Sequence, residues 1–321
     1  MRFARREWRR QFEQDWVEEL ALGLAVRHLW VVRREDELAR KKGHGLTPKE
    51  EAAALDATAL LSSFSPVRSP SGVEGSLRPR EVGGGGWCFF SAFFAQLSSR
   101  RIPCFEYLAV LALAEMASRA TEFAPFFVHS CADALGREAP EVREARSFLR
   151  SVPAYRSFVG QLSPFQCVIL DKFEGVLSGD FLDLRRYLDE HDILVLLQLS
   201  ACEVLVVESD DVNRDGGLAR SCVYPARESM GAGLCGRFRA GELDMIVVRY
   251  ELGSYLHYAS VEFDDGRPWQ LPPRKRELLE LRYSDCDVCR AVRGGDDDLA
   301  RMLMYTRLSG GAAPGEVVTL S

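Results

Sequence analysis

The sequence predicts an α+β fold, in which a mixed domain follows an N-terminal helical arm. Two apolar runs, Trp87–Leu97 and Cys104–Ala120, have the length of buried helices. Three segments rich in β-branched residues predict strands, at Glu203–Glu208, Asp244–Tyr250 and His257–Phe263. Because only six residues separate the last two segments, they are expected to form an antiparallel hairpin.

The first 62 residues predict the helical arm. An apolar residue recurs every four positions from Phe12 to Leu24, by way of Trp16 and Leu20, as on one face of a helix. A second helix is predicted to start at Thr47-Pro48, where Thr caps the helix, Pro takes the first helical position and Glu50 the third. Residues 63–82 are rich in Ser, Pro and Gly and predict a linker. The main domain is expected over residues 83–265, followed by a C-terminal extension over 266–321.

The remaining segments give weaker patterns. Residues 137–160 predict a helix that Pro153 interrupts, and residues 180–191 predict an amphipathic helix. The apolar run at 193–199 fits either an extension of that helix or a strand. Residues 209–241 are polar and rich in Gly and predict a long surface loop, whereas 278–282 and 299–307 predict short helices.

Composition limits the classes of function. The chain has 321 residues, of which 47% are hydrophobic and 27% charged, as in globular proteins. A net charge of −6 argues against binding of nucleic acid through overall charge. No uncharged apolar stretch is long enough for a membrane span, and the start lacks the apolar core of a secretory signal. A cytosolic or nuclear protein is therefore expected.

The nine cysteines are an odd number, which in this setting predicts free thiols in a reducing compartment. Most lie in apolar runs and are expected to be buried. Only Cys286 and Cys289 have the spacing of metal ligands. Because no second pair and no nearby His accompany them, no metal site is predicted.

Cys88 has the setting of a nucleophile. It follows four glycines and Trp87, and it begins an apolar helix. Glycines allow a tight turn, and the start of a helix offers N–H groups that favour a thiolate and can bind an oxyanion. Gly85, Gly86 and Trp87 are the candidate oxyanion loop. The alternative is a structural cysteine that follows a flexible linker.

His257 is the candidate base. It begins a strand directly after a short loop, where its side chain can project into a cleft, and a thiolate–imidazole pair needs no closeness in sequence. The other four histidines, at positions 28, 44, 129 and 191, lie in segments that favour surface or structural roles.

Together the two segments resemble the OTU family of papain-like cysteine proteases, most of which remove ubiquitin. Gly-Gly-Gly-Trp-Cys88-Phe-Phe resembles the family's nucleophile block D-G-x-C-x-[FW], and His257-Tyr-Ala-Ser-Val resembles its terminal block H-Y-x-S-V. The segment Asp180–Leu184 and the strand after it are similar to the elements that precede the family's His strand. The resemblance covers roughly residues 80–265 and implies a papain-like OTU fold, with a central sheet between helical layers.

The sequence departs from the family at two positions. The family usually has Asp three residues before the cysteine, where this chain has Gly85, and many members have Asp or Asn two residues after the histidine, where it has Ala259. Some members take the third catalytic residue from upstream of the cysteine, which makes Glu81 a candidate and Glu74 another. The alternatives are a Cys–His dyad and an inactive relative.

The resemblance implies a cysteine-dependent deubiquitinase that cleaves the isopeptide bond after the C-terminal glycine of ubiquitin. Cys88 is then the nucleophile, His257 the base and Glu81 the candidate third residue. The partner is ubiquitin or polyubiquitin, and no cofactor, membrane or nucleic acid is expected. The alternative function is a catalytically impaired relative that binds ubiquitin or serves as a scaffold.

Overall fold

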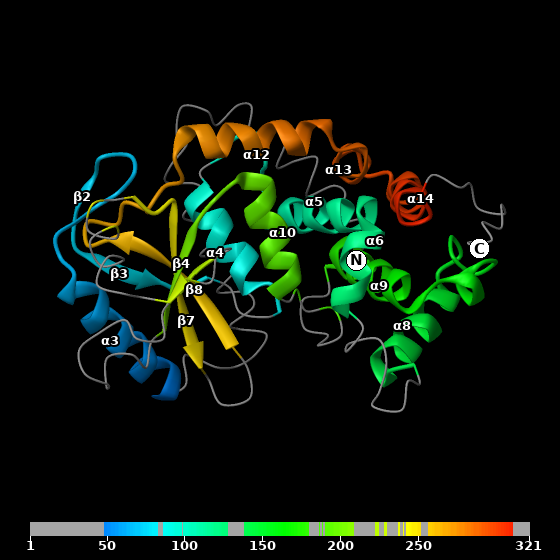
Figure 1. The fold of residues 1–321 in the computed structure, drawn as a ribbon, viewed down its shortest axis with the longest axis horizontal. Helices are drawn as coiled ribbons and strands as arrows, with labels where there is room; N and C mark the ends of the chain where they lie inside the picture. The colour runs from blue at the N-terminus through cyan, green and yellow to red at the C-terminus, as the bar shows by residue number, and fades with distance from the viewer. Residues whose placement is uncertain are drawn as a thin grey trace. The chain divides into compact units, whose positions relative to one another are not determined.

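The computed structural model has a mixed α+β architecture, as the sequence predicts (Figure 1). It describes residues 48–82, 86–97, 99–127, 138–179, 190–208, 222–224, 228–229, 242–251 and 256–310, and single residues at 186, 188, 237 and 240. The chain divides into two compact units. Of the described residues, those within 48–105 and 197–280 make up a sheet unit, and those within 106–196 and 281–310 make up a helical unit.

The sheet unit is built on a six-stranded sheet in the order β3-β8-β7-β4-β5-β6. Strands β4 and β7 run parallel, and every other neighbouring pair is antiparallel. The predicted hairpin is confirmed as β7 and β8, and the predicted strand at 203–208 as β4. The strands are β3 (Leu77–Arg80), β4 (Val204–Glu208), β5 (Cys222–Tyr224), β6 (Glu228–Ser229), β7 (Met245–Glu251) and β8 (Leu256–Phe263).

Helices α3 (Pro48–Ser63) and α4 (Cys88–Leu97) pack on this sheet. Leu60 and Leu61 of α3 share one apolar core with Val248 of β7 and Ala259 of β8. Side chains alternate along a strand, so Ser260 faces the other side, where it meets α4 through a hydrogen bond from Gln96. The two helices therefore cover opposite faces of the sheet (Figure 1).

The segment predicted as a linker, residues 63–82, is instead part of the folded sheet unit. It contains β1 (Val67–Arg68), β2 (Glu74–Gly75) and β3, and β3 pairs with β8 from Leu77 opposite Phe263 to Arg80 opposite Ser260. The polar composition misleads because β3 is an edge strand, where Pro79 does not interrupt a ladder on both sides. Of the predicted arm, the described part is α3, which belongs to the sheet core.

The described part of the expected C-terminal extension, residues 266–310, is also folded. Trp269 is fully buried in the core of the sheet unit, and the two predicted short helices lie within α12 and α14. The run at 193–199 is helical and lies in α10. The remaining helices are α5 (Phe105–Ser118), α6 (Ala120–Phe123), η2 (Ala124–Phe127), α8 (Pro140–Ser151), η3 (Val159–Gln161), α9 (Pro164–Ser178), α10 (Glu190–Ser200), α12 (Pro273–Asp285), α13 (Asp287–Arg293) and α14 (Asp297–Leu308).

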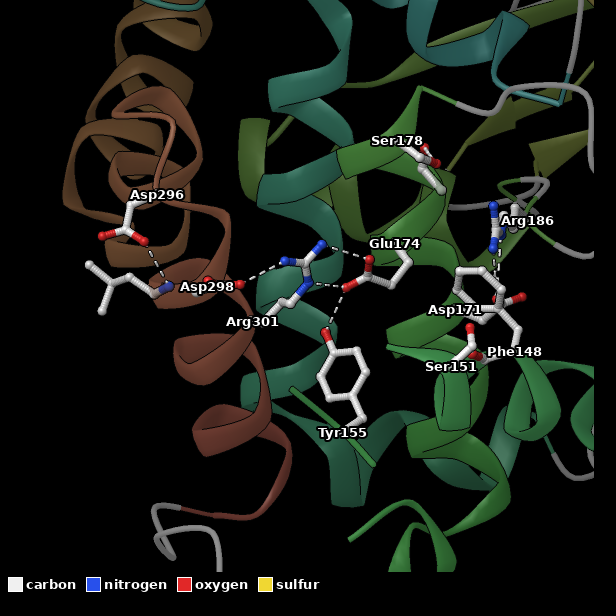
Figure 2. A network of polar contacts seen from close by, with 12 residues as sticks. Phe148, Ser151, Tyr155, Asp171, Glu174, Ser178, Arg186, Asp296, Asp298 and Arg301 are labelled. Carbon is white, nitrogen blue, oxygen red and sulfur yellow. Dashed lines mark hydrogen bonds and ion pairs between the residues drawn. The ribbon is translucent and has the colours of Figure 1, made fainter. Parts of the chain in front are cut away.

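The helical unit holds paired charges in its interior. Figure 2 shows the guanidinium of Arg301 donating to Glu174 of α9, which also accepts from the phenol of Tyr155. On the same helix Asp171 accepts from Arg186, and Lys172 donates to Asp192 at 2.6 Å. Each of these buried charges contacts an opposite charge. We therefore interpret these groups as structural and not as a second functional site.

Among the described residues, no helix combines the length and the apolar character that crossing a membrane requires.

Candidate active site

Cys88 is the first residue of α4 and is 6% exposed. Gly86 and Trp87 form the turn that leads into the helix, and the buried Trp87 ring packs edge-on against Phe105, with ring centroids 6.3 Å apart. The carbonyl of Trp87 accepts from the N–H of Ser91, so the helical bonding starts at this turn. Gly85, the third member of the predicted oxyanion loop, lies outside the described residues.

The sulfur of Cys88 contacts the end of strand β8. Among the described residues, the pairing of β3 with β8 ends at Arg80 and Ser260. Beyond that end, the backbone N–H of Tyr258 donates to Sγ of Cys88 over 3.4 Å. The aromatic ring of Tyr258 packs edge-on against Phe89, the residue after the cysteine, at 5.4 Å between centroids. Two contacts therefore hold the start of α4 against β8.

His257 and Glu81 lie together at the same end of β8. Nε2 of His257 is 3.0 Å from Oε2 of Glu81, which directly follows β3. An ionised carboxylate only accepts, so Nε2 carries the proton and Nδ1 is the ring nitrogen left for Cys88. Glu74, the other candidate for the third residue, lies on β2 and pairs with Arg68 instead.

Electrostatics favours a protonated His257. Burial lowers the pKa of His257, but hydrogen bonds and charge interactions with Cys88 and Glu81 outweigh it and raise the pKa to about 10. The contacts with Cys88 and with Glu81 both act in this direction, because each of them stabilises the charged imidazolium. The three side chains can therefore form a thiolate–imidazolium pair that a carboxylate orients.

A buried glutamine fixes α4 to the two strands of the hairpin. The side chain of Gln96, in the last turn of α4, donates to the carbonyl of Ile246 and to Oγ of Ser260, and its Oε1 accepts from the N–H of Ile246. Gln96 and Ser260 are 0% and 1% exposed. This bridge sets how α4, which carries Cys88, lies along β8, which carries His257.

Ala259 lies two residues after His257 on β8. It is fully buried, in the apolar core that α3 shares with the sheet. Its methyl group is thus a packing element of the core, and the carboxylate beside the imidazole comes from Glu81 on the neighbouring segment.

Sequence reasoning missed three contacts around the candidate site. The bond from Tyr258 to Cys88 and the pairing of Arg249 with Tyr258 depend on strand register, and the bridge from Gln96 to Ser260 depends on helix packing. The sequence carries no local signal for any of them. The structure does not describe the histidines at 28, 44 and 129, nor the side chain of the histidine at 191.

Cys286 and Cys289 have a structural arrangement. Cys286 caps α13, and its sulfur accepts from the N–H of Cys289 over 3.3 Å. Within the described part of the chain, no three His, Cys, Asp or Glu side chains are grouped to hold a metal ion.

Comparisons with protein-family models, with curated proteins and with solved structures gave no match to this chain.

Proposed function

We propose that the chain is an OTU-like, papain-like cysteine deubiquitinase, which hydrolyses the isopeptide bond after the C-terminal glycine of ubiquitin. One observation carries this proposal: Glu81, Cys88 and His257, which lie far apart in sequence, meet at one end of β8. The contacts follow the order expected of a nucleophile, a base and an orienting acid. The choice of ubiquitin as substrate comes from the resemblance of the Cys88 and His257 segments to the OTU blocks.

In the first half of the reaction, the thiolate of Cys88 attacks the carbonyl carbon of the isopeptide bond. The oxyanion that forms accepts hydrogen bonds from N–H groups at the start of α4 and in the glycine turn. When the C–N bond breaks, the imidazolium of His257 gives its proton to the departing lysine amine. The product is a thioester between Cys88 and the last glycine of ubiquitin.

In the second half, the neutral imidazole of His257 takes a proton from water, and the hydroxide attacks the thioester. The second tetrahedral intermediate collapses, the C–S bond breaks and the thiolate of Cys88 is restored. Throughout, Glu81 holds the imidazole through Nε2 and stabilises its charged form.

A cytosolic or nuclear site of action fits the cysteines. The six whose side chains the structure describes are free and buried. Free thiols are typical of a reducing compartment.

Labelling with ubiquitin that carries a C-terminal propargyl group tests the proposal. We expect one adduct, which mass spectrometry assigns to Cys88, and its loss in Cys88→Ala with little change in melting temperature. Labelling at Cys286 or Cys289 would contradict the assignment. Binding of ubiquitin without an adduct would favour the other candidate function, a catalytically impaired module that only binds ubiquitin. One observation favours this second candidate: Gly85 stands where the OTU family usually has Asp.

A further inference from the structure

A row of three polar side chains crosses the sheet toward the candidate site. Glu208 of β4 is paired in register with Arg249 of β7, and Arg249 is paired in register with Tyr258 of β8. Directly opposed residues point to the same face of a sheet. Since Val248 and Ala259 face α3, this row faces α4.

The side chains of the row are joined to one another. The guanidinium of Arg249 forms an ion pair with Glu208, which is 3% exposed, and it donates a hydrogen bond to the phenol oxygen of Tyr258. The guanidinium of Arg249 thus lies between a buried carboxylate and the phenol of Tyr258.

Tyr258 is the last member of the row and the one that meets the nucleophile. Its N–H donates to Sγ of Cys88, its ring packs on Phe89, and it directly follows His257 in the chain. Among the described residues, β3 no longer pairs with β8 at this point, so β7 is the neighbour that holds this part of β8. At Tyr258 the backbone of β8 pairs only with β7 among the described residues, and the bond from Arg249 adds a side-chain link between these two strands.

We infer that Arg249 is a positioning residue, which acts through Tyr258 to fix the sulfur of Cys88 relative to the imidazole of His257. The inference deepens the proposed function and rests on Cys88 being its nucleophile. Arg249 itself touches neither Cys88 nor His257 in any contact described above. Its effect on the reaction passes through the phenol, and removal of the phenol oxygen alone must therefore reproduce the loss of the guanidinium.

The test uses the alkylation of Cys88 by iodoacetamide, which needs no ubiquitin. Rates are measured from pH 5 to 10 by mass spectrometry for the wild type, Tyr258→Phe, Arg249→Met and the double variant. Tyr258→Phe keeps the ring, the N–H and the pairing with β7, so it keeps the fold. We expect each single variant to lower the rate about tenfold, as for one hydrogen bond, and to change the pH profile. The double variant should be no slower than either single one.

Two matched controls separate positioning from stability. Arg78→Met removes another Arg–Glu pair in register across the same sheet, since Arg78 donates to Glu262 at 2.7 Å, and it should leave the alkylation rate unchanged. Arg249→Lys keeps the charge and should recover part of the rate. Alkylation at the wild-type rate in Tyr258→Phe would overturn the inference, as would additive losses in the double variant.

The ubiquitin probe distinguishes this inference from the proposed function. If the wild type is not labelled by propargyl ubiquitin but Tyr258→Phe slows alkylation, the substrate class is wrong and the positioning role stands. If the probe labels the wild type and Tyr258→Phe at the same rate, and alkylation is also unchanged, the proposed function stands and the positioning role is wrong.

Discussion

The carboxylate of Glu81 lies 3.0 Å from Nε2 of His257, although 176 residues separate the two along the chain. The contact exists because β3 ends beside β8, and Glu81 is the residue that follows β3. It places a carboxylate beside the imidazole, where Ala259 offers none.

Replacing this carboxylate should slow the reaction. Glu81→Gln keeps the size of the side chain but removes the charge that stabilises the imidazolium, so turnover of ubiquitin with a C-terminal fluorogenic amide should fall at least about tenfold. Glu74→Gln is the matched control, because Glu74 pairs with Arg68 and should leave turnover unchanged. The opposite pattern, with Glu74→Gln slow and Glu81→Gln normal, would mean that Glu81 is not the orienting acid.

The raised pKa of His257 predicts a pH dependence of stability. Its pKa rises from an ordinary 6.5 to about 10 in the folded protein, so the folded state holds the proton more tightly. The resulting stabilisation is complete below pH 6.5 and is lost as the pH rises through about 10. Denaturant unfolding of the wild type and of His257→Gln should show a stability difference that shrinks over this range.

Imidazole NMR gives an independent measurement of the same shift. The apparent pKa of His257 should lie near 10 in the wild type and fall in Glu81→Gln and in Cys88→Ala, since each variant removes one of the two partners that raise it. A wild-type value near 6.5 would show that the imidazole does not hold its proton in this way.

Ala259→Asn should not restore an orienting group. Ala259 is fully buried in the apolar core beneath α3. The amide of an asparagine at this position would therefore be buried among apolar side chains. We expect a loss of about 1–3 kcal/mol in unfolding free energy and no gain in turnover. Calorimetry and the fluorogenic assay measure both quantities. Faster turnover at unchanged stability would show that the new side chain reaches His257.

Gln96→Met should loosen the contact between α4 and the hairpin. The substitution nearly preserves volume, but it leaves polar groups of Ile246 and Ser260 buried without the glutamine, at a cost of about 2–3 kcal/mol in unfolding free energy. Ser260→Ala removes one of these partners and should cost less. Equal stabilities for Gln96→Met and the wild type would show that the bridge contributes nothing.

Gly175→Ala tests the charged interior of the helical unit. A Cβ at Gly175 would lie 2.7 Å from Cδ of Arg186, which packs over Phe148 and pairs with Asp171. The clash should displace Arg186 and destabilise the protein by about 1–3 kcal/mol. Gly160→Ala is the control, because a Cβ there meets nothing within 4 Å, and thermal unfolding should hardly change.

Local patterns in the sequence were enough to predict the helices and strands that have long apolar runs. Helices α4 and α5 and the hairpin of β7 and β8 follow from length, β-branched content and loop size. Strand β3 does not, because Leu-Arg-Pro-Arg resembles a loop until β8 pairs with it. Helix α9 has a local signal of another kind, a capping box between Ser163 and Gln166.

The residues of the candidate site also differ in whether local sequence predicts them. Cys88 and His257 are predicted from their own neighbours in the chain, whereas Glu81 could be proposed only as one of two upstream acids. The roles of Tyr258 and Arg249 depend on which residues strands β4, β7 and β8 place opposite one another. Register is a property of pairs of segments, and a single sequence gives no direct measure of it.

The pairing of β3 with β8 also has a consequence for how activity would be lost. Side chains alternate along both strands, so sliding β3 by one residue would turn Glu81 away from His257 and turn Leu77 out of the core. A mispaired molecule would thus lose the contact between Glu81 and His257 and part of its apolar core together. The same four residue pairs between β3 and β8 therefore determine both the energetic cost of a wrong alignment and the position of Glu81 beside His257.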